Sequence, residues 1–148
     1  GEFDNPNYFN QIKAMPEWEN VDFLGYVPNA EVGEKVYKQA SVGLVLLHKA
    51  PNHTHSIPIK QFEYMQAGLP VIASREVLFC KQVTEEENCG LVVDPLNIDE
   101  VAQAIRTITS DSELAKQMSA NAKQASADKY NWLSQEKSLL EFYQSLFD

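Results

Sequence analysis

Short runs of apolar residues alternate with amphipathic segments along this chain. The clearest runs cover residues 42–47 (VGLVLL), 71–73 (VIA) and 91–93 (LVV), and a shorter run covers residues 21–24 (VDFL). Continuous apolar runs of this kind are typical of strands in a parallel sheet that helices cover on both faces. We therefore predict four strands at these positions.

The segments between and after these runs have the apolar spacing of helices. The predicted helices cover residues 30–40, 58–67 and 99–109, then a polar helix after Ser110-Asp111, and a last helix from about Trp132. Asn29 is the predicted cap of the first helix, and Gly68 ends the second. Strands that alternate with helices form βαβ units, so the predicted class is α/β, a Rossmann-like parallel sheet with helices on both faces that ends in two or three helices.

Composition agrees with one globular domain over residues 1–148. The chain has 44% apolar and 22% charged residues, which is ordinary globular usage. Acidic residues outnumber basic residues 21 to 12 and give a net charge of -9, which argues against nucleic acid or an anionic membrane as the main partner. No apolar run approaches the ~20 residues of a membrane span. Because residue 1 is glycine and not methionine, we expect the chain to be part of a longer protein.

The cysteines and histidines suggest no metal cofactor. Cys80 and Cys89 do not have the spacing of a redox or zinc pair, and we expect two reduced, partly buried thiols in a cytosolic protein. His48, His53 and His55 lie within eight positions, which raises the alternative of a metal site. A polar loop is the favoured interpretation, because no carboxylate within the cluster completes a ligand set.

The segment of residues 53–74, HTHSIPIKQFEYMQAGLPVIAS, carries the candidate chemistry. Its polar loop follows a predicted strand, and parallel sheets bind ligands outside the carboxyl ends of their strands. The loop leads into a helix with Pro58 and Lys60 in its first turn, where free N–H groups attract an anion. Lys60 opposes the helix dipole unless a phosphate shares the site. Glu63, one turn later, is placed to accept hydrogen bonds from a ribose diol, although a Lys60–Glu63 surface pair is the alternative.

The same segment resembles the C-terminal domain of GT-B glycosyltransferases of the family 4, or group 1, type. Such sequences follow the pattern S-x-P-x-K-x-F-E-Y-M-x-A-G-x-P-V-I-A and continue with a Cys-Gly motif before the next strand. The matching residues are Ser56, Pro58, Lys60, Phe62, Glu63, Tyr64, Met65, Ala67, Gly68, Pro70, Glu87, Cys89, Gly90, Val93 and Pro95. The likeness covers residues 21–147 and includes the Tyr130-Asn131-Trp132 motif before the last helix.

The resemblance implies a nucleotide-diphosphate sugar donor that binds without a metal ion or other cofactor. Of the family's two donor-site acids, eight positions apart, the second matches Glu63, which would hold the ribose. The first falls on His55, so this chain departs from the pattern at the position that usually contacts the sugar. The implied catalytic residues are His55, Lys60 and Glu63, and the implied donor-binding residues are Gly25, Tyr26 and Val27 around the base, with Ser56, Ile57, Pro58, Lys60 and Glu63 around the phosphates and ribose.

The implied activity is transfer of a hexose, with retention, to a glycan or lipid-linked acceptor in bacterial polysaccharide biosynthesis. The expected location is the cytoplasm or the cytoplasmic face of a membrane. The family's N-terminal acceptor-binding domain has no counterpart here, so we expect the piece to be inactive alone and to pair with that missing domain.

Two alternatives to a glycosyltransferase stay open. A nucleotide-sugar epimerase has a similar two-domain fold. A non-catalytic α/β binding module would explain His55 and the lack of the family's basic phosphate-binding pair before Val21.

In the family, the last helix often crosses to the other domain. The aromatic side chains of residues 132–147 are therefore interpreted as core or interdomain contacts, with part of the helix exposed in this piece.

Overall fold

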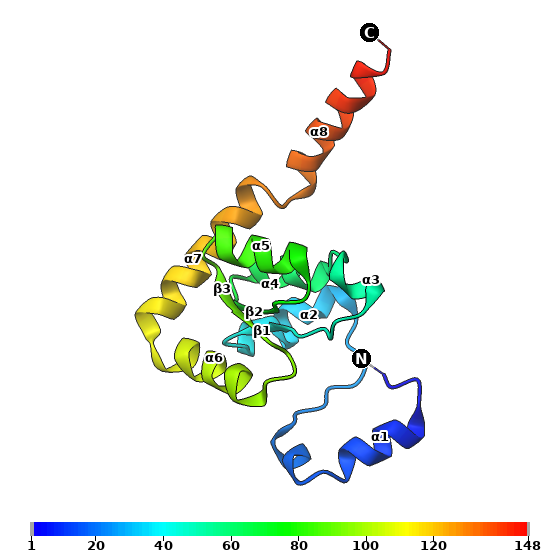
Figure 1. The fold of residues 1–148 in the computed structure, drawn as a ribbon, viewed down its shortest axis with the longest axis vertical. Coiled ribbons are helices and arrows are strands. Elements are labelled where there is room, and N and C mark those ends of the chain that lie inside the picture. The colour runs from blue at the N-terminus through cyan, green and yellow to red at the C-terminus, as the bar shows by residue number, and fades with distance from the viewer. Residues whose placement is uncertain (1, 148) are drawn as a thin grey trace. The chain divides into compact units, whose positions relative to one another are not determined.

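The computed structural model describes residues 2–147, and the chain divides into two compact units, Gly1–Gln39 and Ala40–Asp148 (Figure 1). The smaller unit contains two α-helices and two short 3-10 helices. These elements are α1 (Pro6–Lys13), η1 (Pro16–Asn20), α2 (Asn29–Lys35) and η2 (Tyr37–Gln39). The larger unit contains the sheet and the remaining helices, and it carries most of the predicted site.

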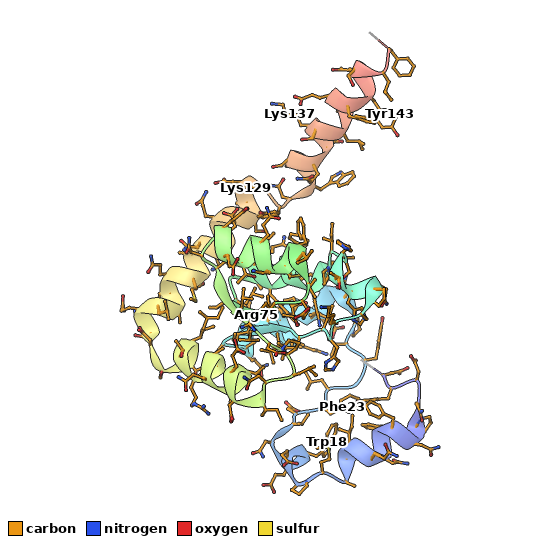
Figure 2. The ribbon with its side chains drawn as sticks, in the orientation of Figure 1. Trp18, Phe23, Arg75, Lys129, Lys137 and Tyr143 are labelled. Carbon is orange, nitrogen blue, oxygen red and sulfur yellow. The ribbon has the colours of Figure 1, made fainter. Side chains whose placement is uncertain are left out.

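An aromatic cluster holds the smaller unit together. The ring of Phe23 lies 5.2 Å from that of Phe9 and 5.8 Å from that of Trp18, centroid to centroid (Figure 2). The predicted strand over residues 21–24 is therefore wrong: these residues form no ladder with any other described segment, and Phe23 contributes its apolar ring to the cluster. The predicted cap is also wrong, since Pro28 precedes α2 and Asn29 is its first residue.

The larger unit is built on three parallel strands, which confirms the predicted α/β class. They are β1 (Gly43–Val45), β2 (Val71–Ser74) and β3 (Gly90–Val93), in the order β1-β2-β3. The remaining helices follow the strands along the chain. They are α3 (Pro51–Thr54), α4 (Ile59–Ala67), α5 (Leu78–Glu86), α6 (Ile98–Ser110), α7 (Ser112–Asp128) and α8 (Trp132–Ser145).

Apolar side chains cover both faces of the sheet. Val45, Val71 and Ala73 belong to a buried cluster with residues of α4, α5 and α7. Ile72 and Val93 belong to a second cluster with residues of α6 and α7. Figure 1 accordingly shows α4 and α5 on one side of the sheet and α6 on the other. All four positions of β2, which has helices on both sides, are buried, and they are apolar except for Ser74. Leu44 of β1 is 37% exposed, so the cover is less complete there.

Local sequence signals fix the ends of the helices that frame the site. α4 ends at Gly68, whose φ of 75° lies in the left-handed region that glycine tolerates best. The Gly68 N–H donates to the Met65 carbonyl (3.0 Å) and the Leu69 N–H to the Tyr64 carbonyl (2.9 Å), which is the Schellman arrangement. The Asp111 carboxylate accepts two N–H bonds at the start of α7, as predicted.

α5 is a helix that the apolar pattern did not predict. Its sequence, LFCKQVTEE, contains only a few apolar residues and runs into the Glu85-Glu86-Glu87 series. Tertiary packing defines it instead, because Cys80 and Val83 lie in the core with the strands. A parallel β2–β3 pair also requires a crossover connection, and α5 provides it.

The corner between α7 and α8 is fixed by one half-buried carboxylate. Glu87 accepts hydrogen bonds from the Lys129 ammonium (2.7 Å) and the Tyr130 hydroxyl (3.2 Å). Burial and then the Glu87 charge raise the pKa of Tyr130 to about 12, so this hydroxyl keeps its proton. Asn131 caps α8 by accepting the Ser134 N–H. These contacts explain why the Tyr-Asn-Trp motif precedes the last helix.

α8 carries exposed apolar side chains along its length. Trp132 is 70% exposed and Phe147, just beyond the helix, is 88% exposed. No residue of α8 is buried, so Trp132, Tyr143 and Phe147 are not core residues of this chain. The predicted exposure of part of this helix is found, and the interdomain contact stays a prediction. No helix within residues 2–147 is long and apolar enough to cross a membrane.

The apolar surface of α8 predicts concentration-dependent self-association of the isolated chain, because exposed patches of this kind are rare in stable monomers. Light scattering over a concentration series measures it. Replacing Leu140 and Phe147, which are 57% and 88% exposed, with serine is expected to return the chain to monomer. A wild-type chain that stays monomeric at high concentration would contradict the prediction.

Gly90 allows β2 and β3 to approach each other, and this sets a second prediction. A Cβ at Gly90 would overlap the backbone carbonyl of Val71, so Gly90→Ala is expected to lower the free energy of unfolding by about 1–3 kcal/mol or more. The control is Gly33→Ala, where an added Cβ meets nothing within 4 Å and helix propensity improves. Urea unfolding of both variants checks it, and equal stability would disprove the close approach.

Candidate functional site

The carboxyl ends of all three strands lie at one edge of the sheet. Since the strands are parallel and in register, the connections that follow β1, β2 and β3 all begin there. The connection after β1, residues 46–58, contains the predicted His55 and the phosphate-binding segment. The fold therefore places this segment at the sheet edge where open α/β sheets bind ligands.

Internal hydrogen bonds shape the connection after β1. His53 donates its Nδ1–H to the His48 carbonyl (2.9 Å), and the Ser56 hydroxyl and N–H both donate to the His53 carbonyl (2.8 and 3.0 Å). The Thr54 hydroxyl donates to the Ala50 carbonyl (3.1 Å). His53 thus braces the loop, while His55 is exposed. Within residues 2–147, no three His, Cys, Asp or Glu side chains are grouped to hold a metal ion.

The N-terminus of α4 is open at the end of this loop. No side chain caps the helix at Pro58, and no acidic residue lies in its first turn. The flanking Ile57 and Ile59 side chains are 57% and 73% exposed, so solvent reaches the first N–H groups. Lys60 is half-buried and forms no ion pair with any residue between 2 and 147. The alternative of a Lys60–Glu63 surface pair is therefore not found in this structure.

Gln61 fixes the opposite side of α4. Its side chain is 1% exposed and donates Nε2–H bonds to the Cys80 carbonyl and the Thr84 hydroxyl, both at 3.3 Å. Met65, one turn later, is fully buried in the core. With Gln61 and Met65 held inside, Lys60 and Glu63 are left on the half-buried sides of the helix.

Both cysteines are free thiols that lie buried in the core. Burial raises the pKa of Cys80 to about 11, although the nearby Lys60 ammonium lowers it in part. Burial also raises the pKa of Cys89 to about 11. The thiolate is the reactive form of cysteine, so both side chains serve as small core residues.

Two further cations lie at the same sheet edge and were not predicted. Arg75 follows β2, and its guanidinium pairs with Glu100 at 2.5 Å (Figure 2). The Lys49 ammonium lies 3.7 Å from the Glu76 carboxylate. Each cation pairs with a carboxylate that is distant in sequence. No local sequence pattern therefore indicated the pairs or their position at this sheet edge. The pairs connect neighbouring loops, and of the three cations Lys60 is the one that forms no ion pair with another described residue.

Gly25, Tyr26 and Val27 belong to the smaller unit. They line a hollow of about 500 Å³ together with apolar residues of α2 and η2. Gly25 has a φ of 64°, which turns the chain here, and the Tyr26 side chain is 71% exposed. The predicted site residues therefore fall into two groups: these three residues in one unit, and residues 55–63 on one continuous segment of the other.

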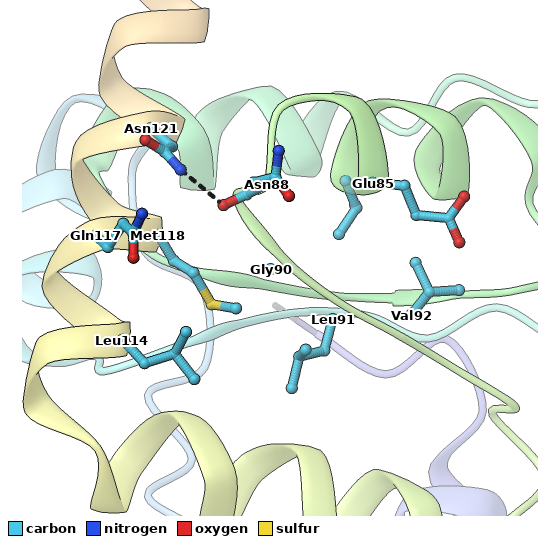
Figure 3. A pocket seen from close by; sticks show the side chains of 10 residues that line it. Glu85, Asn88, Gly90, Leu91, Val92, Leu114, Gln117, Met118 and Asn121 are labelled. Atoms are coloured by element: carbon cyan, nitrogen blue, oxygen red, sulfur yellow. Dashed lines mark hydrogen bonds between the residues drawn. The ribbon is translucent and has the colours of Figure 1, made fainter.

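A separate groove of about 550 Å³ lies between α5, β3 and α7 (Figure 3). It opens near Gly90, at the amino end of β3, which is the opposite sheet edge from the predicted site. Asn121 donates its Nδ2–H to the Asn88 carbonyl (3.0 Å) at its rim. None of the residues predicted to bind a donor lines this groove.

Comparison with known families now connects the segment to an enzyme class. The sequence profile of the family described as "Glycosyl transferases group 1" matches residues 2–125. The chain belongs to the group 1 glycosyltransferases. This match includes residues of both units, among them the loop after β1 and α4. It confirms the group 1 glycosyltransferase family, which the motif of residues 56–73 indicated.

Two curated relatives of this glycosyltransferase chain carry the same general description. An uncharacterized glycosyltransferase of Methanocaldococcus jannaschii is 31% identical over 123 residues, covering 83% of this chain and 30% of the relative. An uncharacterized glycosyltransferase of Haemophilus influenzae is 26% identical over 125 residues, covering 84% and 33%. The chain thus spans about a third of the length of these relatives.

A solved structure supports the fold of this glycosyltransferase chain. Sucrose-phosphate synthase from Thermosynechococcus elongatus superposes with a TM-score of 0.80 at 24% identity, covering 99% of this chain and 36% of that one. The similarity supports the predicted Rossmann-like, GT-B type of architecture.

The buried thiols give a prediction about pH. Both are protonated in the native state up to a pKa of about 11, whereas unfolded thiols lose protons near their ordinary value of 9.0. The stabilisation that these two thiols contribute to the free energy of unfolding is therefore expected to be complete below about pH 9 and to be lost as the pH rises from 9 to 11.

Cys80→Ala/Cys89→Ala is the matched control for this pH series, and its decline over pH 9 to 11 should be smaller. At pH 8, a disulfide reagent should label the wild-type thiols only after denaturant is added. Rapid labelling of the native chain would contradict the assignment of both cysteines to the core.

Proposed function

We propose that this chain is the donor-binding domain of a family 4 type glycosyltransferase that transfers a hexose from a nucleotide-diphosphate sugar. The observation that carries the proposal is Lys60, a half-buried cation without an acidic partner in the described chain, beside the uncapped N-terminus of α4. A cation and free N–H groups on one turn form a complementary environment for a diphosphate. Membership of the group 1 family supports the same substrate class.

Each predicted residue has a role in this proposal. Lys60 and the first N–H groups of α4 bind the diphosphate, with Ser56, Ile57 and Pro58 shaping the approach. Glu63 accepts hydrogen bonds from the ribose diol. The loop of residues 25–27 frames the base, and His55 faces the sugar, where its imidazole replaces the carboxylate found in the family pattern.

The proposed chemistry requires charge stabilisation more than acid–base catalysis by this domain. When the bond between the anomeric carbon and the diphosphate oxygen breaks, the electron pair stays on the departing diphosphate. Lys60 and the N–H groups of α4 stabilise that negative charge, and preorganised donors of this kind are effective because they need no rearrangement. The proposed transfer retains the anomeric configuration and needs no metal ion.

The acceptor is proposed to bind a second domain of the full-length protein. The chain spans only about a third of its relatives, which leaves room for such a domain. A glycan or lipid-linked acceptor fits the family, and the proposed location is the cytoplasmic side of the cell. The exposed apolar side chains of α8 are proposed to contact that second domain.

Calorimetric titration of the chain with UDP and with GDP tests the donor site. Wild type is expected to bind one of the two nucleotides, and Lys60→Met to bind it about 10–100-fold more weakly, since hydrogen bonds to charged groups contribute about 1.5–3 kcal/mol. The matched control is Lys116→Met, which removes the same charge from an exposed Lys116–Glu113 pair on α7.

Two outcomes of this titration, and one outcome of an activity assay on the full-length protein, count against the proposal. No binding of either nucleotide would contradict a donor site in this chain. If Lys60→Met and Lys116→Met weakened nucleotide binding equally, the change in net charge would explain the effect without a specific contact from Lys60. If the full-length protein altered the donor sugar without any acceptor, the epimerase alternative would replace sugar transfer.

A further inference from the structure

Ser74, the last residue of β2, is a buried polar side chain that the proposed donor site does not yet use. Its side chain is fully buried, and its hydroxyl touches only the backbone of the neighbouring chain segment. We infer that Ser74 is a positioning residue for the donor site, because its hydroxyl fixes the path by which the chain leaves β1 toward Lys60. This inference rests on the proposed function.

The Ser74 hydroxyl extends the β1–β2 ladder by one rung. The ladder begins with the Gly43 N–H donating to the Pro70 carbonyl (2.9 Å) and proceeds in register to Val45 opposite Ala73. In a regular parallel ladder, the Leu47 N–H would next donate to the Ser74 carbonyl. Here it donates to the Ser74 hydroxyl instead, at 2.7 Å.

Because the Leu47 N–H bonds to the Ser74 hydroxyl and not to the Ser74 carbonyl, β1 and β2 can separate at this point. The Ser74 carbonyl is occupied by the Val77 N–H (3.2 Å), which turns the chain toward α5. The hydroxyl also donates to the Val45 carbonyl (3.1 Å). One side chain therefore holds both Val45 and Leu47 at the point where β1 ends, while the Ser74 backbone stays paired with Val93 of β3. Removing the hydroxyl would leave the part-buried Leu47 N–H without its partner and would take one hydrogen bond from the Val45 carbonyl.

The loop beyond Leu47 depends on this anchor for its position. Its internal hydrogen bonds, from His53 to His48 and from Ser56 to His53, fix its shape. Its position is set where it leaves the sheet, at Leu47, and where it enters α4. Leu46 and Leu47 pack against the two core clusters, and the exposed Lys49–Glu76 pair at 3.7 Å adds little, as is usual for surface pairs. A shift at Leu47 would therefore displace the segment that precedes Lys60.

The test combines amide hydrogen exchange with nucleotide titration on the 148-residue chain. Ser74→Ala removes the hydroxyl, and Ser74→Thr retains it. Val83→Ala is the control, because Val83 is a core residue of α5 whose truncation lowers stability without touching the loop. Exchange is measured at the Leu47 amide, and affinity is measured for UDP and GDP.

The inference predicts a distinct response for each variant. In Ser74→Ala, the Leu47 amide should exchange at least ~10-fold faster than in Val83→Ala, with the two rates compared under conditions where both variants have the same free energy of unfolding. The nucleotide affinity of Ser74→Ala should be at least ~5-fold lower than that of wild type. Ser74→Thr should restore slow exchange and affinity to within about twofold of wild type. If Ser74→Ala does not fold, Ser74→Cys, which keeps the size but weakens both hydrogen bonds, takes its place with the same predictions.

The two proposals fail in different ways. If wild type binds neither nucleotide, the proposed function fails. If wild type binds and Ser74→Ala keeps its affinity within twofold, the positioning role fails while the donor site stands. An equal loss of affinity in Val83→Ala would also overturn the inference, since lower overall stability would then explain the effect.

Discussion

The parallel pairing of three short strands is the constraint on which the rest of this structure depends. It requires a crossover connection between successive strands, and the helices of these connections, α4 and α5, cover the face that carries Val45. The helices α6 and α7, which follow β3, cover the face that carries Ile72 and Val93. The parallel pairing also brings the three carboxyl ends to one edge. The candidate donor segment lies at that edge because it is the connection after β1, and Ser74 ties the end of β1 to β2 where the ladder stops.

Electrostatics at this edge are local and not a property of the whole chain. The net charge is -9, so the long-range field opposes a diphosphate. Two cations near the edge, Arg75 and Lys49, are paired with carboxylates. Lys60 and the uncapped start of α4 supply the remaining attraction for an anion. The account therefore requires a short-range site in which direct hydrogen bonds outweigh the unfavourable mean charge.

The sequence predicted the parts of the fold that have strong local signals. The runs at residues 42–47, 71–73 and 91–93 each overlap a strand, and Gly68 ends α4. It did not predict α5, which depends on tertiary packing, or the irregular path of residues 21–24, whose phenylalanine packs on aromatic rings instead of pairing in a sheet. For the site, the pattern indicated the segment around Lys60. The Ser74 contacts and the pairing of Arg75 with Glu100 join residues more than 20 positions apart and had no local signal.

The most direct test of the central claim is a map of backbone amide shifts by nuclear magnetic resonance during titration with UDP or GDP. If the diphosphate binds at the start of α4, the largest shifts should fall on the N–H groups of residues 56, 57 and 59–61 (residue 58 is proline and has none), while those of Asn88 and Asn121 in the groove beside β3 stay unchanged. Shifts concentrated in that groove, with residues 56–61 unaffected, would contradict the account.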